Sequence, residues 1–320
     1  MFKSRGNSVP YSLTYVDTQK GKWHKFFARI YMSLPKGILI AVGGAEDKGI
    51  EAERADINRL DFFKEGILNR IVELAGKKEE PRIEVVTTAS SIPEEVGRIY
   101  KKAFKKLGCA YVGHLKIVQR EEADQPKVLE RLEQANCILF SGGDQLRLCS
   151  ILGGTQFISR MKERYFQEYF IVAGTSAGAA AMSHTMISGG PDDKAYLKGE
   201  VRLSIGFGFM QNVIIDTHFD TRGRFGRLAQ AITNQPNELG IGLDEDTGVI
   251  VEKGYRLKAI GSSSVVLIDG REITHSNVAN IKGGMPISVS NLKVHILSHS
   301  DVYDIDKHQF ISKSLDFHVK

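Results

Sequence analysis

Hydrophobic residues in the first two thirds of the chain come in short runs that are separated by longer segments of mixed character. The runs are rich in β-branched residues, which is typical of strands buried on both faces of a sheet. They cover residues 37–42, 83–87, 115–118, 137–140, 170–173 and 213–216. Between them, apolar residues recur at helical spacing in segments such as 56–74, 93–107, 127–134 and 157–165. This alternation predicts a parallel sheet with helices on both faces.

The pattern changes after residue 245. β-Branched runs and turn residues alternate over 249–270, which is typical of antiparallel strands joined by short turns. We therefore expect a mostly parallel, doubly wound α/β fold with a C-terminal antiparallel β extension. A chain of 320 residues with 42% hydrophobic content is long enough for one large core. We predict a single domain over 36–290, because a boundary inside 37–251 would separate the motifs discussed below.

The two ends of the chain differ from this domain. Residues 1–35 are predicted to be an N-terminal extension, in which a short helix docks on the domain or on a second subunit of a homodimer. The apolar residues of that helix are Trp23, Phe26, Phe27, Ile30 and Tyr31. Residues 291–320 are polar and irregular, and we expect a tail there. No segment has the pattern of a secretory signal or the length of a membrane span.

The formal net charge of +5 raises the question of nucleic-acid binding. The densest basic run, residues 101–106, lies in a predicted helix whose other face is apolar, so we expect its lysines to face solvent. No nucleic-acid-binding motif accompanies them, and we expect no such partner. Cys109, Cys137 and Cys149 have neither metal-ligand spacing nor a disulfide framework. We interpret them as buried apolar residues of a cytoplasmic protein.

The segment Gly174-Thr175-Ser176-Ala177-Gly178 carries the strongest chemical signal. It follows an apolar run and leads into the helix formers of 179–182, which predicts a strand, a sharp turn and a helix with Ser176 at the apex. Because residues 174 and 178 lack Cβ atoms, the turn can be tight enough to expose the serine hydroxyl. A turn whose small residues serve only close packing would give a similar pattern. A nucleophilic role for Ser176 therefore needs support from catalytic partners elsewhere in the chain.

Suitable partners follow downstream. His218 lies at the end of the predicted strand 213–216, and the carboxylates of residues 244–246 follow another apolar run. The carboxyl ends of parallel strands meet at one edge of a sheet, so these side chains can converge with Ser176. A serine needs a base to take its proton and an acid to orient that base. The alternative for His218 is a buried structural histidine, and spacing does not choose among the three acids.

Two glycine-rich turns flank the serine in the sequence. Gly143 follows the strand predicted over 137–140, and we predict that its N–H and that of Ala177 form an oxyanion hole. A tight turn with no chemical role is the alternative. The turn over 43–47 lacks the spacing of nucleotide-binding loops, and its Glu46 and Asp47 are interpreted as caps of the next helix.

These motifs resemble those of the cyanophycinases, a serine peptidase family that also contains aspartyl dipeptidases. The resemblance spans about residues 36–270 and rests on five ordered segments: 41–48, 140–145, 174–179, 216–219 with the arginines that follow it, and 242–245. It implies a fold similar to the class I glutamine amidotransferases, with serine in place of their nucleophilic cysteine. The resemblance also selects Glu245, rather than Asp244 or Asp246, as the acid that orients His218.

The resemblance further implies the residues of a substrate pocket. They are Gln145, Asp216, Thr217, Arg222, Arg224 and Arg227. An arginine can bind a carboxylate bidentately, and Asp216 can pair with a guanidinium; a surface position on a helix is the alternative for Arg227. Cyanophycinases usually read Asp-Gln-His-Phe where this chain has Thr217 before His218. On a regular strand Thr217 faces away from its two neighbours, so it reaches substrate only if the chain twists.

The expected function is therefore that of a serine exopeptidase. It would hydrolyse cyanophycin, a polyaspartate with arginine on its β-carboxyls, to β-Asp-Arg dipeptides through an acyl-enzyme. An aspartyl or isoaspartyl dipeptidase acting on short peptides is the alternative among enzymes, and a non-catalytic binding protein is the alternative outside them. No cofactor or metal is expected, because no His, Cys and carboxylate cluster has ligand spacing.

Overall fold

The computed structural model describes residues 34–49, 60–191 and 194–311. The helix predicted around Trp23 to Tyr31 lies outside the described residues, as does part of the segment 56–74. The described residues from Pro35 to Ile311 cluster as one compact unit. None of the helices in the described part of the chain is both long and apolar enough to cross a membrane.

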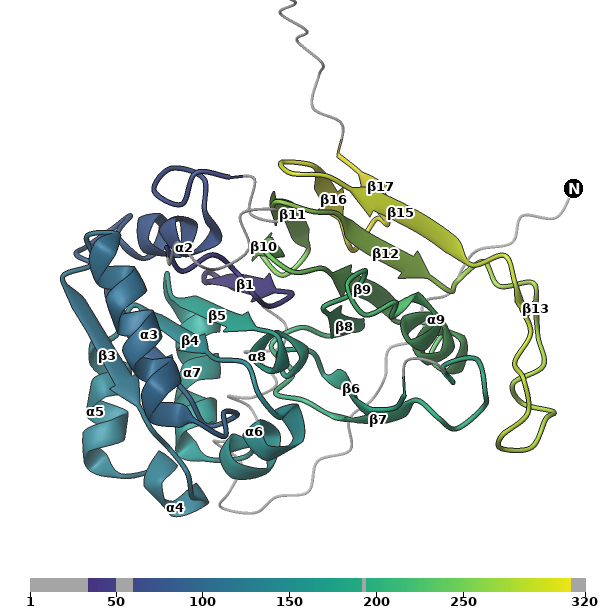
Figure 1. Ribbon diagram of the computed structural model, residues 1–320, viewed down its shortest axis with the longest axis horizontal. Helices are drawn as coiled ribbons and strands as arrows, with labels where there is room; N and C mark the ends of the chain where they lie inside the picture. Colours follow the sequence, from purple (N-terminus) through teal and green to yellow (C-terminus); the bar gives the residue numbers. More distant parts are fainter. Residues whose placement is uncertain (1–33, 50–59, 192–193, 312–320) are drawn as a thin grey trace, which may run out of the picture. The chain divides into compact units, whose positions relative to one another are not determined.

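The main sheet has five adjacent parallel strands, which are followed on one side by antiparallel strands. Within the described residues it has nine strands in the order β17-β16-β11-β10-β1-β5-β4-β2-β3 (Figure 1). The parallel strands are β1 (Ile38–Val42), β5 (Ile171–Thr175), β4 (Cys137–Phe140), β2 (Arg82–Val86) and β3 (Tyr111–Leu115). The antiparallel strands are β10 (Thr247–Glu252), β11 (Arg256–Gly261), β16 (Val302–Asp304) and β17 (Gln309–Phe310). The predicted α/β fold with an antiparallel extension is confirmed.

A second sheet holds the strand that we expected to continue the first. Its order is β15-β12-β9-β8, and it comprises β8 (Val213–Thr217), β9 (Leu239–Leu243), β12 (Val265–Asp269) and β15 (Lys293–Leu297). β8 and β9 are parallel, whereas the other pairs are antiparallel. The prediction that residues 213–216 join the parallel sheet was wrong. The reason is that β10 pairs antiparallel with β1 and occupies that edge.

Two other sequence predictions differ from the structure. The strand expected at 115–118 lies at Tyr111–Leu115, where Gly113 and His114 interrupt the apolar run. Residues 291–311 are not an irregular tail but contain β15, β16 and β17, which extend both sheets. Their sequence was hard to interpret because β15 lies at a sheet edge and alternates between exposed and partly buried residues.

Helices cover both faces of the main sheet. They are α2 (Ile67–Ala75), α3 (Pro93–Lys106), α4 (Arg120–Ala123), α5 (Pro126–Gln134), α6 (Gln145–Leu152), α7 (Gln156–Gln167) and α8 (Ala177–Ala180). The helix α9 (Phe225–Asn234) packs instead against β8, β9 and β12 of the second sheet. Two short hairpins complete the described elements: β6 (Thr185–Gly189) with β7 (Arg202–Ile205), and β13 (His275–Ser276) with β14 (Val289–Ser290). Buried residues of α2 and α3 form a core with the strand side chains on one face of the main sheet. Those of α5 to α8 form a second core with the strand side chains on the other face.

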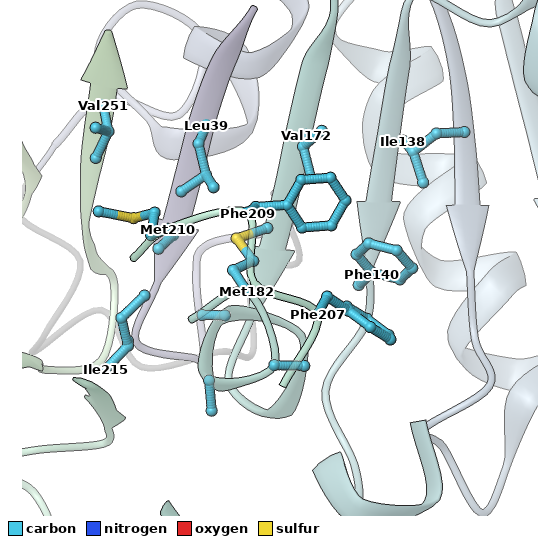
Figure 2. Close-up of a cluster of buried hydrophobic side chains, with 14 of the residues drawn as sticks. Leu39, Ile138, Phe140, Val172, Met182, Phe207, Phe209, Met210, Ile215 and Val251 are labelled. Atoms are coloured by element: carbon cyan, nitrogen blue, oxygen red, sulfur yellow. The ribbon is translucent and has the colours of Figure 1, made fainter. Parts of the chain in front are cut away.

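The second of these cores supports the turn that carries Ser176. Figure 2 shows Leu39, Val172, Ile138 and Phe140 of the main sheet facing Met182, which follows α8. Ile215 of β8 belongs to the same cluster, so side chains of both sheets share one core. Its close packing fixes where the ends of β5 and β8 lie relative to each other.

Candidate active site

Ser176 lies on a strained turn between β5 and α8. Its φ is 51° and its ψ is −114°, a conformation that costs a non-glycine residue on the order of 1–3 kcal/mol. The Ser176 N–H donates to the carbonyl of Val42 at 2.9 Å. A Cβ atom at Gly174 would lie 2.6 Å from the backbone of Gly178, and one at Gly178 would lie 2.4 Å from the carbonyl oxygen of Phe140. Both glycines are therefore sterically required.

His218 and Glu245 lie next to this serine. Ser176 Oγ is 3.0 Å from His218 Nε2, and His218 Nδ1 is 2.8 Å from Glu245 Oε1. His218 follows β8 and also has a positive φ, of 50°. The three side chains come from two sheets, since Ser176 follows β5 and Glu245 follows β9. They form one continuous line of hydrogen-bonding groups.

The other two acids near residue 245 have different partners. Asp244 accepts hydrogen bonds from the N–H and hydroxyl of Thr221, at 3.0 and 2.9 Å. Asp246 accepts from the N–H of Asp47 at 3.2 Å and from the hydroxyl of Ser262. Among the acids over which the sequence left the choice open, Glu245 is the one that contacts His218.

Burial favours the neutral form of His218. The pKa of this imidazole lies below its usual 6.5, because removal from water disfavours the imidazolium. The hydrogen bond to Glu245 opposes this effect, whereas the charges of Arg222 and Arg224 reinforce it. A histidine that is neutral at pH 7 can accept a proton from Ser176 Oγ.

A cavity of about 80 Å³ opens beside Ser176 and His218. Gly143 and Ala177, the predicted oxyanion-hole residues, both line it. Gly143 has a φ of 139°, and a Cβ atom there would lie 2.1 Å from the carbonyl oxygen of Ala89. Ala177 is the first residue of α8, so its N–H has no acceptor within that helix. Two N–H groups at the cavity wall are suited to stabilising a negative oxygen.

The predicted substrate-binding residues line the same cavity. They are Gln145, Asp216, Thr217, Arg222, Arg224 and Arg227. Arg227 is a buried residue of α9, and its Nε donates to Asp216 Oδ2 at 2.9 Å, so the surface alternative is wrong. Arg224 Nη1 donates to the Thr217 carbonyl at 2.7 Å. Arg222 is exposed.

Sequence reasoning missed two residues near the site. Gly44 has a φ of 116°, and a Cβ atom there would lie 2.4 Å from His218 Cε1, so its backbone packs against the imidazole. Glu46 was interpreted as a helix cap, but it is buried and accepts a hydrogen bond from Thr175 Oγ1 at 2.6 Å. The paired glycines before a carboxylate were the sequence signal that could have indicated this role.

Within the described residues, no cluster of His, Cys, Asp and Glu is arranged to hold a metal ion.

The fold and this geometry define a serine hydrolase of the α/β class. Residues 61–258 match peptidase family S51, and the chain belongs to this family of serine peptidases. The cyanophycinase of Thermosynechococcus vestitus is 35% identical over 280 residues, which cover 88% of this chain and 83% of that protein. The cyanophycinase of Trichormus variabilis is 35% identical over 270 residues, which cover 84% of this chain and 86% of that protein.

A solved structure supports the fold. The crystal structure of a peptidase from an acI-B1 Actinobacterium has a TM-score of 0.61 at 21% identity, over 86% of this chain and 99% of that one. The family assignment that the sequence resemblance implied is confirmed.

The packing of Gly44 against His218 leads to a mutational prediction. Gly44→Ala should displace the imidazole from Ser176 and lower kcat for peptide hydrolysis by about 100-fold. Gly108→Ala is the matched control, since Gly108 also has a positive φ, of 78°, but a Cβ atom there meets nothing within 4 Å. Steady-state kinetics and thermal unfolding of both variants provide the comparison. Equal activity of the two variants would contradict this role of Gly44.

The lowered pKa of His218 predicts the acid limb of the pH profile. A base must be neutral to act, so kcat/KM should fall as the pH drops through an apparent pKa below 6.5. Because the hydrogen bond to Glu245 raises the pKa of His218, Glu245→Gln should move this limb to lower pH. Profiles of wild type and variant with a soluble β-aspartyl peptide test both statements. An inflection above 6.5, or a shift in the opposite direction, would refute them.

Proposed function

We propose that this peptidase hydrolyses cyanophycin and releases β-Asp-Arg dipeptides, with Ser176 as nucleophile, His218 as base and Glu245 as the acid that orients His218. The observation that carries the proposal is the hydrogen-bonded line from Ser176 Oγ through both ring nitrogens of His218 to Glu245. In serine peptidases the proton of the serine moves to the histidine across the first of these contacts, and the acid orients the histidine through the second. The names of the two cyanophycinase relatives support the choice of substrate.

The proposed reaction has two halves. His218 Nε2 takes the proton of Ser176 Oγ as this oxygen attacks the scissile carbonyl carbon, and the oxyanion accepts hydrogen bonds from the N–H groups of Gly143 and Ala177. Collapse breaks the C–N bond, and His218 returns the proton to the leaving amine. A water then attacks the acyl carbon with His218 again as base; the ester bond to Ser176 Oγ breaks, and His218 returns the proton to this oxygen. The carboxylate of Glu245 stabilises the imidazolium in each half.

Charges around the cavity support a substrate that carries carboxylates. Arg222 is exposed at the cavity, so its guanidinium can bind the free carboxylate of an arginine unit bidentately. Asp216 is 2% exposed and pairs with Arg227. We therefore propose that this pair forms part of the rigid wall of the pocket and that Asp216 does not bind the guanidinium of the substrate.

An aspartyl or isoaspartyl dipeptidase is the second candidate. The observation that favours it is Thr217 at the cavity, where cyanophycinases usually have glutamine. Threonine is shorter and offers a single hydroxyl, so it supports fewer contacts to an extended unit. Independence from cofactors, a homodimeric state and a cytoplasmic location accompany the proposal as predictions.

The role of the nucleophile can be tested by removing one hydroxyl. Ser176→Ala should lower release of β-Asp-Arg from insoluble cyanophycin by about 10⁴-fold or more, and His218→Ala should do comparable damage, because these residues act as a unit. Ser150→Ala, at an exposed position of α6, is the control and should keep wild-type activity. Dipeptide release is measured by mass spectrometry. Near-normal release by Ser176→Ala would exclude the proposed mechanism.

The choice between the two substrates can be tested at Thr217. Thr217→Gln should change KM, or the preference between cyanophycin and short β-aspartyl peptides, more than kcat, because it alters a binding contact that persists through the reaction. Parallel kinetics with both substrates are the measurement. Loss of kcat at unchanged KM for every substrate would instead mean that residue 217 supports the geometry of His218.

A further inference from the structure

The turn that follows β1, residues 43–47, contacts the segments that carry all three site residues. The carbonyl of Gly43 accepts a hydrogen bond from the N–H of His218 at 2.9 Å. The carbonyl of Gly44 accepts one from the N–H of Asp246 at 2.9 Å, next to Glu245. The turn is therefore fixed to the base and to the acid through its backbone.

The same turn contacts the residue before the serine through a side chain. Glu46 is 2% exposed, and its Oε2 accepts a hydrogen bond from Thr175 Oγ1 at 2.6 Å. Its Oε1 accepts from the hydroxyl of Tyr100 on α3, and Lys48 Nζ lies 3.6 Å from that oxygen. Burial alone would raise the pKa of Glu46, but Lys48 and the two hydroxyls outweigh it and keep the pKa low. A buried, hydrogen-bonded carboxylate thus contacts Thr175, the residue that precedes the serine.

Thr175 transmits this contact to the nucleophile. It is the last residue of β5, it is buried, and it pairs with Val42 of β1. The next residue is Ser176, whose strained φ of 51° persists only if its surroundings fix it. The bond to Glu46 fixes the side chain of the residue before this strained position.

We propose that Glu46 is a positioning residue, which holds the Ser176 turn in register with His218 through the hydroxyl of Thr175. The inference rests on the proposed role of Ser176 as nucleophile. Glu46 does not line the cavity beside Ser176, so it contacts no substrate there. Its loss should therefore affect kcat and leave KM nearly unchanged. Burial of a charged group is often unfavourable, because the free energy cost of its desolvation can exceed the free energy gained from its partners. A buried carboxylate at this position therefore favours a specific role.

The test compares the two hydroxyl partners of the same carboxylate. Thr175→Val removes the donor next to Ser176, whereas Tyr100→Phe removes the donor on α3. If Glu46 acts through Thr175, Thr175→Val should lower kcat for dipeptide release by about 10-fold or more, and Tyr100→Phe by clearly less. Thr175→Ser keeps the hydroxyl and should restore most of the activity. Glu84→Gln is the control, since Glu84 is equally buried but pairs with Arg131, away from the site.

A second measurement reports the nucleophile without a peptide substrate. Phenylmethanesulfonyl fluoride reacts with an activated serine, so its rate constant of inactivation should fall in parallel with kcat in Thr175→Val and in Glu46→Gln. Glu84→Gln should keep the wild-type rate constant. Thermal unfolding shows which variants are folded, and Glu46→Gln decides the question if Thr175→Val does not fold.

The outcomes separate this inference from the proposed function. If Ser176→Ala is inactive but Thr175→Val and Tyr100→Phe lose kcat equally, the carboxylate has a structural role and the inference fails while the function stands. Unchanged kcat in Glu46→Gln would also overturn the inference. If Ser176→Ala keeps its turnover, the proposed function fails and the inference fails with it.

Discussion

The hydrogen bond between Ser176 Oγ and His218 Nε2 sets the main constraint on this structure. The two residues follow strands of different sheets, yet their side chains must lie 3.0 Å apart. Both have a positive φ, at 51° and 50°, so each turn is strained where the side chains meet. Such strain persists only where the surroundings fix it. Much of the nearby packing serves this purpose.

Two kinds of interaction fix the two turns. The apolar core around Met182 and Ile215 holds the ends of β5 and β8 together (Figure 2). The backbone at the end of β1 and in the turn after it adds directional bonds, because the carbonyl of Val42 accepts from the N–H of Ser176 and the carbonyl of Gly43 accepts from the N–H of His218. Apolar packing sets the approximate distance, and hydrogen bonds set the angles that proton transfer needs.

The sequence predicted local features better than it predicted strand pairing and contacts between residues that are distant in the chain. The turn at Gly174 to Gly178 could be predicted, since its glycines and β-branched run are local signals. The second sheet could not, because nothing local says that β10 takes the edge of β1. Arg227 was ambiguous for the same reason, as its partner Asp216 lies 11 residues away on another element. The burial of Glu46 depends on Thr175, which is 129 residues distant in the chain.

The proposed mechanism requires that Ser176 carries the acyl group during turnover. The most direct measurement is the mass of the protein quenched in acid while it processes an activated ester of β-Asp-Arg, followed by peptide mapping. The expected result is an added mass of the acyl unit on the peptide that contains Ser176, and no added mass in Ser176→Ala. Turnover with the added mass on a different residue would contradict the role of Ser176 as nucleophile.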